Sequence, residues 1–270
     1  MHVLLTNDDG VFGEGLRVLR EELLALGARV TVVAPEGERS GVGRAITIDG
    51  PVSVKPAGGT AESPVFACSG TPVDCVRIGL LSELVARADL VLAGINHGLN
   101  AGDDATYSGT VGAALEAALL GYPAAAFSQQ RQGGSFRHDV AEPGIDFPLA
   151  GTAARLALAL AESPPPGRAA LSVNLPVASG EPELALTRPG RRSYHRGFLA
   201  PAFESAGDSH FHPYGTPWDL PAPYEDEPDT DFFALGAGRI SVSVISPDWG
   251  DHDGSVDLRQ WFESFRIGGS

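Results

Sequence analysis

Two adjacent carboxylates follow the first apolar run of this 270-residue chain, in the segment Thr6-Asn7-Asp8-Asp9-Gly10. Neighbouring carboxylates repel and raise each other's pKa unless a cation lies between them, so the pair predicts a divalent metal site. The same residue types cap helices, and an Asp ahead of the helix predicted over residues 15–26 could serve only as its cap. The motif alone leaves both interpretations open.

Further oxygen donors follow two other predicted strands. Ser40 offers a hydroxyl oxygen and Asn96 an amide oxygen, each at a strand-to-loop junction. Oxygen ligands with positions left for water suit Mg²⁺ or Mn²⁺ rather than zinc or copper. We therefore expect one Mg²⁺ or Mn²⁺ ion per subunit, held by Asp8, Asp9, Ser40 and Asn96.

Small residues at Ser108-Gly109-Thr110 open onto a helix predicted over residues 111–120. The unpaired N–H groups and the positive end of a helix suit a phosphate, although an ordinary Ser/Thr cap has the same composition. A phosphate bound here, beside the metal, would allow metal-assisted phosphoester hydrolysis, in which a bound water becomes nucleophilic near neutral pH.

The elements that position these residues predict an α/β fold. Residues 3–5 form an uninterrupted apolar run, which is typical of a strand buried on both faces of a parallel sheet. A helix over 15–26 and a strand over 29–34 complete a βαβ unit. We predict a Rossmann-like, mostly parallel sheet flanked by helices, with its ligands at the carboxyl edge. Further strands are expected over 89–94, 124–128 and 169–174, and helices over 73–84 and 149–161. The first turn lacks Gly-x-Gly-x-x-Gly, which disfavours NAD.

The chain divides by composition into three parts that form a single functional domain. Residues 1–175 are the predicted catalytic core, with a β-excursion over 45–55 and 65–68. In residues 176–235 proline, glycine, aromatic and acidic residues replace the rhythm of helices and strands. We predict that this segment forms extended arms or β-hairpins outside the main sheet, used for oligomerisation. Residues 236–270 are predicted to contain a late strand and a helix over 258–265.

Charge and hydropathy exclude several classes of partner. The net charge of −15 disfavours a nucleic-acid polymer as partner, and the acidic run 224–231 is predicted to be a solvated loop. We expect no membrane partner, because no apolar run approaches the roughly 18 residues that a span requires. A cytoplasmic location is expected, because the first strand begins at residue 2 with no leader. Cys68 and Cys75 are expected to be reduced and buried.

The motifs and their order closely resemble the SurE family of survival-protein nucleotidases. The resemblance rests on Thr6–Gly10, Ala34-Pro35 with Arg39-Ser40-Gly41, Ser69–Val76, Gly94–Asn100, Tyr107–Val111, Val173–Pro176 and Gly238–Val242. It implies a divalent-metal-dependent 5′/3′-nucleotidase that releases phosphate from nucleoside monophosphates. Its metal ligands correspond to Asp8, Asp9, Ser40 and Asn96, and its phosphate-binding turn to residues 108–110. The resemblance also implies a homodimer or homotetramer formed through C-terminal arms.

We accordingly expect Asp8, Asp9, Asn96 and His97 to be catalytic, and Asn7, Arg39, Asn100, Ser108, Gly109 and Thr110 to bind substrate. His97 either donates a proton to the leaving oxygen or lines the loop. Arg39 and Arg44 either contact phosphate or lie in solvent. The spacing of His210 and His212 is that of metal ligands, and the alternative is a loop or subunit contact. Two other functions stay open: a phosphatase of another phosphorylated metabolite, and a noncatalytic, metal-dependent nucleotide sensor.

Overall fold

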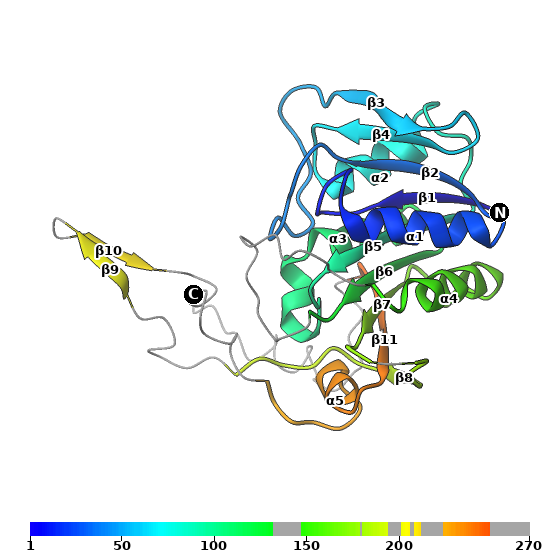
Figure 1. Ribbon diagram of the computed structural model, residues 1–270. Coiled ribbons are helices and arrows are strands. Elements are labelled where there is room, and N and C mark those ends of the chain that lie inside the picture. The colour runs from blue at the N-terminus through cyan, green and yellow to red at the C-terminus, as the bar shows by residue number, and fades with distance from the viewer. Residues whose placement is uncertain (132–146, 179, 194–200, 206–207, 212–223, 249–270) are drawn as a thin grey trace, which may run out of the picture.

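A nine-stranded mixed sheet runs through the molecule in the order β3-β4-β2-β1-β5-β6-β7-β11-β8 (Figure 1). The computed structural model describes residues 1–131, 147–178, 180–193, 201–205, 208–211 and 224–248. The strands are β1 (His2–Thr6), β2 (Arg29–Pro35), β3 (Val54–Gly59), β4 (Pro64–Cys68), β5 (Leu90–His97), β6 (Ala124–Gln129), β7 (Ala170–Leu175), β8 (Leu184–Thr187) and β11 (Ile240–Ile245). The strands from β4 to β7 in this order are mutually parallel, which confirms the predicted Rossmann-like α/β class.

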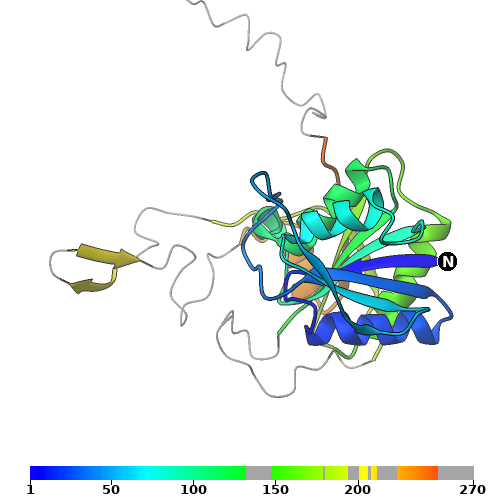
Figure 2. The same cartoon turned by 90° about the horizontal axis from the view of Figure 1, so that it is seen from above.

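Helices cover both faces of the sheet, as Figures 1 and 2 show. The helical elements are α1 (Glu14–Ala25), α2 (Pro72–Leu81), η1 (Gly102–Tyr107), α3 (Gly109–Leu119), α4 (Ala150–Glu162) and α5 (Asp231–Gly236). One apolar cluster joins α1 and α4 to the sheet, and a second joins α2 and α3 to the opposite face. Cys68 and Cys75 are free thiols buried in this second cluster, as expected.

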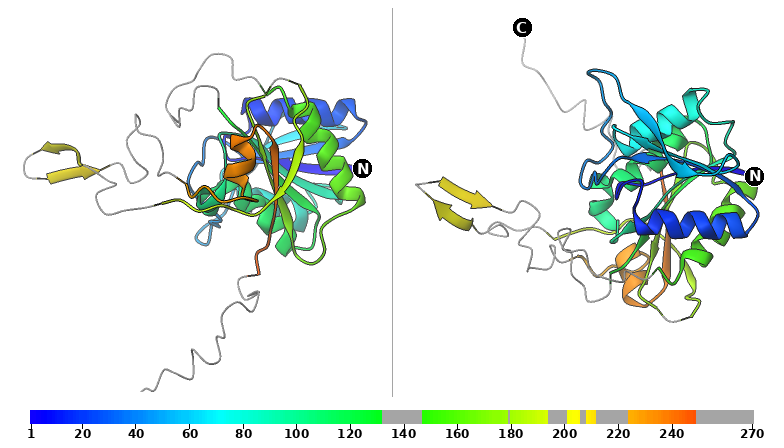
Figure 3. Two further views of the ribbon diagram at one scale, coloured as in Figure 1. Left: turned by 90° about the horizontal axis from the view of Figure 1, so that it is seen from below. Right: turned by 45° about the horizontal axis from the view of Figure 1, so that its top comes forward.

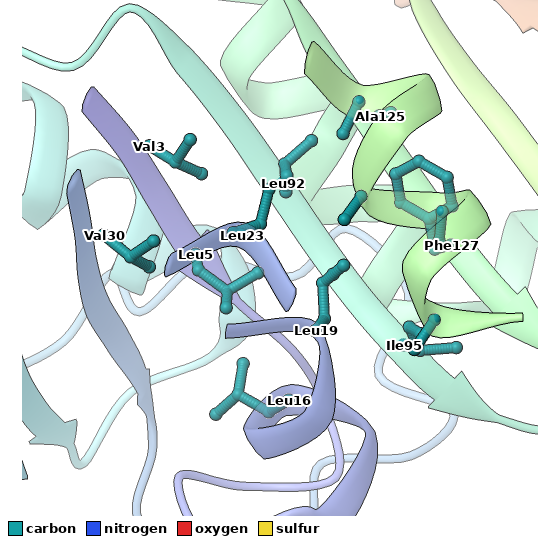
Figure 4. Packing of buried hydrophobic residues seen from close by; sticks show 14 of the residues in the cluster. Val3, Leu5, Leu16, Leu19, Leu23, Val30, Leu92, Ile95, Ala125 and Phe127 are labelled. Atoms are coloured by element: carbon teal, nitrogen blue, oxygen red, sulfur yellow. The ribbon is translucent and has the colours of Figure 1, made fainter. Parts of the chain in front are cut away.

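The first βαβ unit shows why the sequence folds in this way. All five side chains of β1 are buried, in keeping with its uninterrupted apolar run. Leu16, Leu19 and Leu23 recur at helical spacing, so they share one face of α1 and pack against Val3 and Leu5 (Figure 4). The packing of α1 on β1 fixes where the chain turns between them.

One strand boundary differs from the prediction in a way that matters for the site. β5 continues to His97, beyond the predicted end at residue 94, because Asn96 pairs with Ser128 and His97 with Gln129 of β6. Asn96 and His97 are therefore the last residues of a strand, and backbone pairing positions both of them. The predicted excursion over 45–55 contains regular strand only from Val54 onward.

The prediction for residues 176–235 is correct in part. β8 lies inside the main sheet, parallel to β11, and α5 packs beneath it, so these two elements are not arms. β9 (Pro201–Ser205) and β10 (Asp208–Phe211) form a hairpin that lies apart from the sheet, as predicted (Figure 3). The late strand is β11, whereas the helix expected over 258–265 falls outside the described residues. A role of these segments in oligomerisation stays a prediction.

The acidic run 224–231 is not solvated throughout, which corrects a second expectation. Asp231 begins α5 and is only 2% exposed, and its carboxylate accepts backbone hydrogen bonds from other segments. No helix in the described part of the chain has both the length and the apolar character that a membrane crossing requires.

Candidate active site

The carboxyl ends of β1 and β5 lie side by side at the centre of the sheet, where the order of the strands reverses. The chain continues from β1 to β2 on one side, whereas β5, β6 and β7 extend the sheet on the other. Open α/β sheets bind their ligands at such a switch point, because the loops diverge there and leave a crevice. Asp8 and Asp9 follow β1, and Asn96 is the last residue but one of β5, so these predicted residues lie at the ligand-binding edge.

Asp8 follows β1, and its buried carboxylate contacts the first residues of α3. Its Oδ1 accepts a hydrogen bond of 2.5 Å from the Thr110 hydroxyl, and its Oδ2 accepts one of 3.2 Å from the Thr110 backbone N–H. Gly109 leaves space for it, because a Cβ on Gly109 would lie 3.0 Å from the Cβ of Asp8. Burial raises the pKa of Asp8, while the donors on Thr110 and the backbone N–H of Gly109 oppose that rise.

The side chain of Asp9 contacts the end of β5. Its Oδ2 accepts a hydrogen bond of 3.3 Å from the backbone N–H of His97. Burial raises the pKa of Asp9 to about 7, and the neighbouring charge of Asp8 adds to this rise. Arg131 acts in the opposite direction on the pKa of Asp9. Two carboxylates are thus held together where their joint ionisation is unfavourable without a cation.

Ser40 and Asn96 belong to two other elements at this edge of the sheet, the loop after β2 and the end of β5. The backbone N–H of Arg39 donates to the carbonyl oxygen of Asp8 at 2.7 Å, which ties the loop after β2 to the end of β1. Ser40 is exposed on that loop, and its hydroxyl donates to Glu38 at 2.9 Å. Asn96 donates from its side-chain nitrogen to the carbonyl oxygen of Gly98, so its amide oxygen is the atom left for another ligand.

The donor chemistry of these residues fits a hard divalent cation. Two carboxylates, one amide and one hydroxyl contribute only oxygen, and the raised pKa of Asp9 shows that a positive charge would be favourable beside it. The described residues contain no cluster of three or more His, Cys, Asp or Glu side chains, so a site built only from those types is absent from them. The predicted ligand set would need its amide and hydroxyl members.

The N-terminus of α3 confirms one of the two roles that its sequence left open, the helix cap, whereas phosphate binding stays a prediction. Ser108 caps the helix, because its hydroxyl accepts a hydrogen bond of 3.1 Å from the N–H of Val111. The first N–H groups of the helix face the Asp8 carboxylate. The positive end of the helix therefore lies beside the predicted metal ligand, as the proposed binding of phosphate at residues 108–110 requires.

Three predicted substrate-binding residues have structural contacts of their own. Asn7 is fully buried, and its side-chain nitrogen donates to the carbonyl oxygen of Gly10 at 2.9 Å, which shapes the turn carrying Asp8 and Asp9. Asn100 donates to the hydroxyl of Ser128 at 2.8 Å. Arg39 donates to the carbonyl oxygen of Ser69 at 3.2 Å, and its side chain is partly exposed.

The histidines and Arg44 also have defined surroundings. The ring of His97 lies 6.5 Å from that of Phe147, in an edge-to-face arrangement. Arg44 forms an ion pair of 2.9 Å with the buried Glu116, so its side chain does not simply lie in solvent, and contact with phosphate stays a prediction. His210 lies in β10, and His212 falls outside the described residues.

Arg131 is a site residue that the sequence reasoning missed. Its Nε and Nη2 donate to the carbonyl oxygen of His97 at 3.0 and 2.8 Å, and its charge acts on Asp9. The available signal was its position: Arg131 follows the strand predicted over 124–128, so it belongs to the same carboxyl edge as Asp8 and Asn96.

Comparison with known proteins gives one consistent result. The model of the family described as "Survival protein SurE" matches residues 3–196. A "5'-nucleotidase SurE" of Rubrobacter xylanophilus is 41% identical and one of Citrifermentans bemidjiense is 38% identical, and each alignment covers 97% of this chain and at least 97% of the relative. A crystal structure of the SurE protein from Aquifex aeolicus superimposes with a TM-score of 0.75 at 31% identity, covering 97% of this chain and 100% of that one. The motifs, the fold and the full-length similarity agree, and the chain belongs to the SurE family.

Proposed function

We propose that this chain is a metal-dependent phosphomonoester hydrolase that removes phosphate from nucleoside 5′- and 3′-monophosphates. The observation that carries the proposal is the buried Asp8 carboxylate held against the N-terminus of α3 by Thr110, with Asp9 and Asn96 beside it. An anion-binding helix end and a group of oxygen donors lie together, and a phosphate ester needs both. The name of the curated relatives, 5'-nucleotidase SurE, supports the nucleotide as substrate.

Asp8, Asp9, Ser40 and Asn96 are the residues that would hold the cation, and Mg²⁺ or Mn²⁺ suits their oxygen atoms best. When bound, the cation would polarise the phosphoryl oxygens and lower the pKa of a water ligand. Ser40 would have to turn from Glu38 to take part, because its hydroxyl now donates to that side chain.

The reaction replaces one bond to phosphorus with another. Water forms the new P–O bond, the bond between phosphorus and the ribose oxygen breaks, and the leaving oxygen takes up a proton. The N-terminus of α3 would orient the phosphoryl group, with Ser108, Gly109 and Thr110 around it. His97, at the end of β5 beside Asp9, is our candidate for the proton donor, and Arg131 would hold the His97 backbone in place.

A panel of phosphate esters tests this function. The purified full chain is assayed for release of inorganic phosphate from 5′- and 3′-mononucleotides and from sugar phosphates, with Mn²⁺, with Mg²⁺ and with a chelator. We expect release from mononucleotides, loss of release with the chelator, and recovery on adding metal. Faster release from sugar phosphates would reassign the substrate, and binding of AMP with metal but without phosphate release would make the protein a nucleotide sensor.

A matched pair of variants tests the metal ligand. Asp8→Asn removes one negative charge at the site, and both metal affinity and turnover should fall together. Asp49→Asn makes the same change at an exposed position outside the site and should retain activity. Unchanged turnover of the Asp8→Asn variant at saturating Mn²⁺ would exclude Asp8 as a ligand.

We also propose that the chain assembles with itself through the segment that includes the β9–β10 hairpin. The hairpin forms a two-stranded sheet separate from the main sheet (Figure 2), and an isolated pair of strands is at best marginally stable by itself. Light scattering on the full chain should give the mass of a dimer or tetramer. A monomeric mass at micromolar concentration would contradict this proposal.

A further inference from the structure

The short helix η1 leads directly into the turn at residues 108–110, and its first residue is held from the far end of the chain. The backbone N–H of Gly102 donates to Oδ2 of Asp231 at 2.6 Å. The second oxygen of Asp231 accepts hydrogen bonds from the N–H groups of Gly190, at 2.9 Å, and Phe232, at 2.8 Å. One buried carboxylate thus joins η1, the segment after β8 and the start of α5.

A buried ion pair fixes the same helix two residues later. Arg192 donates to Oδ2 of Asp104 at 2.5 and 3.1 Å, and the two side chains are only 6% and 7% exposed. The backbone N–H of Arg192 also donates to the carboxylate of Asp103 at 2.7 Å. The guanidinium group lies 4.5 Å from the centre of the Phe232 ring, which completes its enclosure.

The packing leaves η1 no room to shift toward α5. A Cβ on Gly102 would lie 2.3 Å from the Phe232 ring and 2.7 Å from the carbonyl oxygen of Gly190. Gly102 also has a φ of +56°, a conformation that favours glycine. The ring of Tyr224 stacks on the ring of Phe232, with 4.7 Å between the two ring centres. We name Asp231, Arg192 and Phe232 the C-terminal clamp.

The clamp holds η1, the element that directly precedes the N-terminus of α3. η1 ends at Tyr107, whose carbonyl oxygen accepts a hydrogen bond of 2.8 Å from Gly43, in the loop that carries Ser40. Ser108 follows and caps α3, and Thr110 binds Asp8. A displacement of η1 would therefore move both the α3 N-terminus and the loop after β2.

Stability alone is a poor reason for such a clamp. A buried ion pair contributes little more to stability than well-packed apolar residues of the same volume, although it fixes a geometry closely. We propose that Asp231 and Arg192 are positioning residues, which hold η1 so that residues 108–110 and the Ser40 loop meet the substrate in register. This inference rests on the proposed phosphatase function, and it extends the site to residues that lie about 90 to 130 positions away in the sequence.

Three variants and one control test the clamp. Asp231→Asn replaces an acceptor of three N–H groups by an amide that turns its NH₂ toward some of them. Arg192→Gln removes the ion pair, and Arg192→Lys retains a charge without the fork geometry. Arg188→Gln is the control: it removes an exposed ion pair with Glu227 in the same segment, and that pair does not contact η1.

Two measurements are made on each full-length variant that gives the circular dichroism spectrum of the original chain. Amide hydrogen exchange over residues 101–111 reports on η1 and the turn, independently of activity. Steady-state kinetics with a mononucleotide report kcat and KM. We expect faster exchange in this window and a kcat/KM lower by about ten-fold or more for Arg192→Gln and Asp231→Asn, with partial recovery for Arg192→Lys. The control should match the original chain in both.

The outcomes separate this inference from the proposed function. If the variants exchange as slowly as the original chain, or keep its kcat/KM while losing only thermal stability, the clamp is purely structural and the inference is overturned. If Asp231→Asn does not fold, the two Arg192 variants decide. If the original chain releases no phosphate from any ester, the proposed function is rejected, and with it the inference that depends on it, whatever the exchange data show.

Discussion

Replacing Thr110 by valine tests the central contact of the site with little change in shape. The substitution removes the hydroxyl that donates to Asp8 at 2.5 Å and keeps the backbone N–H that donates at 3.2 Å. A hydrogen bond to a charged group contributes about 1.5–3 kcal/mol. Because one donor remains, we take the lower end, about 1.5 kcal/mol, which corresponds to about a ten-fold change in an equilibrium constant.

The expected result is a weaker metal site. Without the hydroxyl, Asp8 loses a contact that orients its carboxylate and one of the donors that oppose the rise of its pKa on burial. We expect the dissociation constant for Mn²⁺, measured by isothermal titration calorimetry, to rise about ten-fold. That agrees with the about 10- to 100-fold losses usual when a partner of a metal ligand is removed. Turnover at limiting Mn²⁺ should fall in parallel.

Thr110→Ser supplies the matched control, because it keeps the hydroxyl and removes only a methyl group. Its Mn²⁺ affinity should stay close to that of the original chain. All measurements are made well below the melting temperature, since valine also leaves a buried acceptor short of a donor. If Thr110→Val binds Mn²⁺ as tightly as Thr110→Ser and turns over as fast, the contact between Thr110 and Asp8 has no part in metal binding.

Three further substitutions test other parts of the fold. Gly109→Ala places a Cβ 3.0 Å from the Cβ of Asp8 and should lower kcat/KM by about ten-fold or more, while Gly37→Ala, with nothing within 4 Å of its Cβ, should not. Glu116→Gln disrupts a buried carboxylate paired with two arginines and should lower the free energy of unfolding in urea by about 1–3 kcal/mol, while the exposed Glu181→Gln should change it much less. Burial lowers the pKa of His2, so the unfolded chain takes up a proton more readily and stability should fall as the pH drops below 6.5; His2→Gln should remove that part of the pH dependence of the melting temperature.

The sheet and its main helices could be predicted because their signals are local. Leu16, Leu19 and Leu23 mark one face of α1 within eight residues, and residues 3–5 of β1 form an unbroken apolar run. The prediction that Asp8, Asp9 and Asn96 share one edge followed from the same logic, since parallel strands end on the same side. Pairing of β5 with β6 beyond residue 94 was not predictable, because the polar residues Asn96 and His97 look like loop.

The clamp shows what local patterns cannot reveal. Asp231 belongs to an acidic run that any local rule assigns to solvent, yet it accepts a hydrogen bond from a residue 129 positions earlier. Arg192 belongs to a segment rich in glycine and proline, and its partner Asp104 lies 88 positions before it. Such pairs arise only when distant segments have already been brought together by the sheet, so single-sequence periodicity contains no trace of them.

The number of hydrogen-bond donors separates the two kinds of buried carboxylate in this protein. Asp231 accepts three backbone hydrogen bonds of 2.6–2.9 Å from the described residues, as expected of a buried carboxylate that holds backbone segments in place. From the described part of the chain, Asp9 accepts one long bond of 3.3 Å, and its pKa is raised to about 7. Burial with so few donors makes an ionised carboxylate unfavourable, and a core built for stability alone would hold an apolar side chain there. Asp9 breaks that rule beside Asp8, at the switch point of the sheet, and places where a sequence breaks its own folding rules are where ligands are expected.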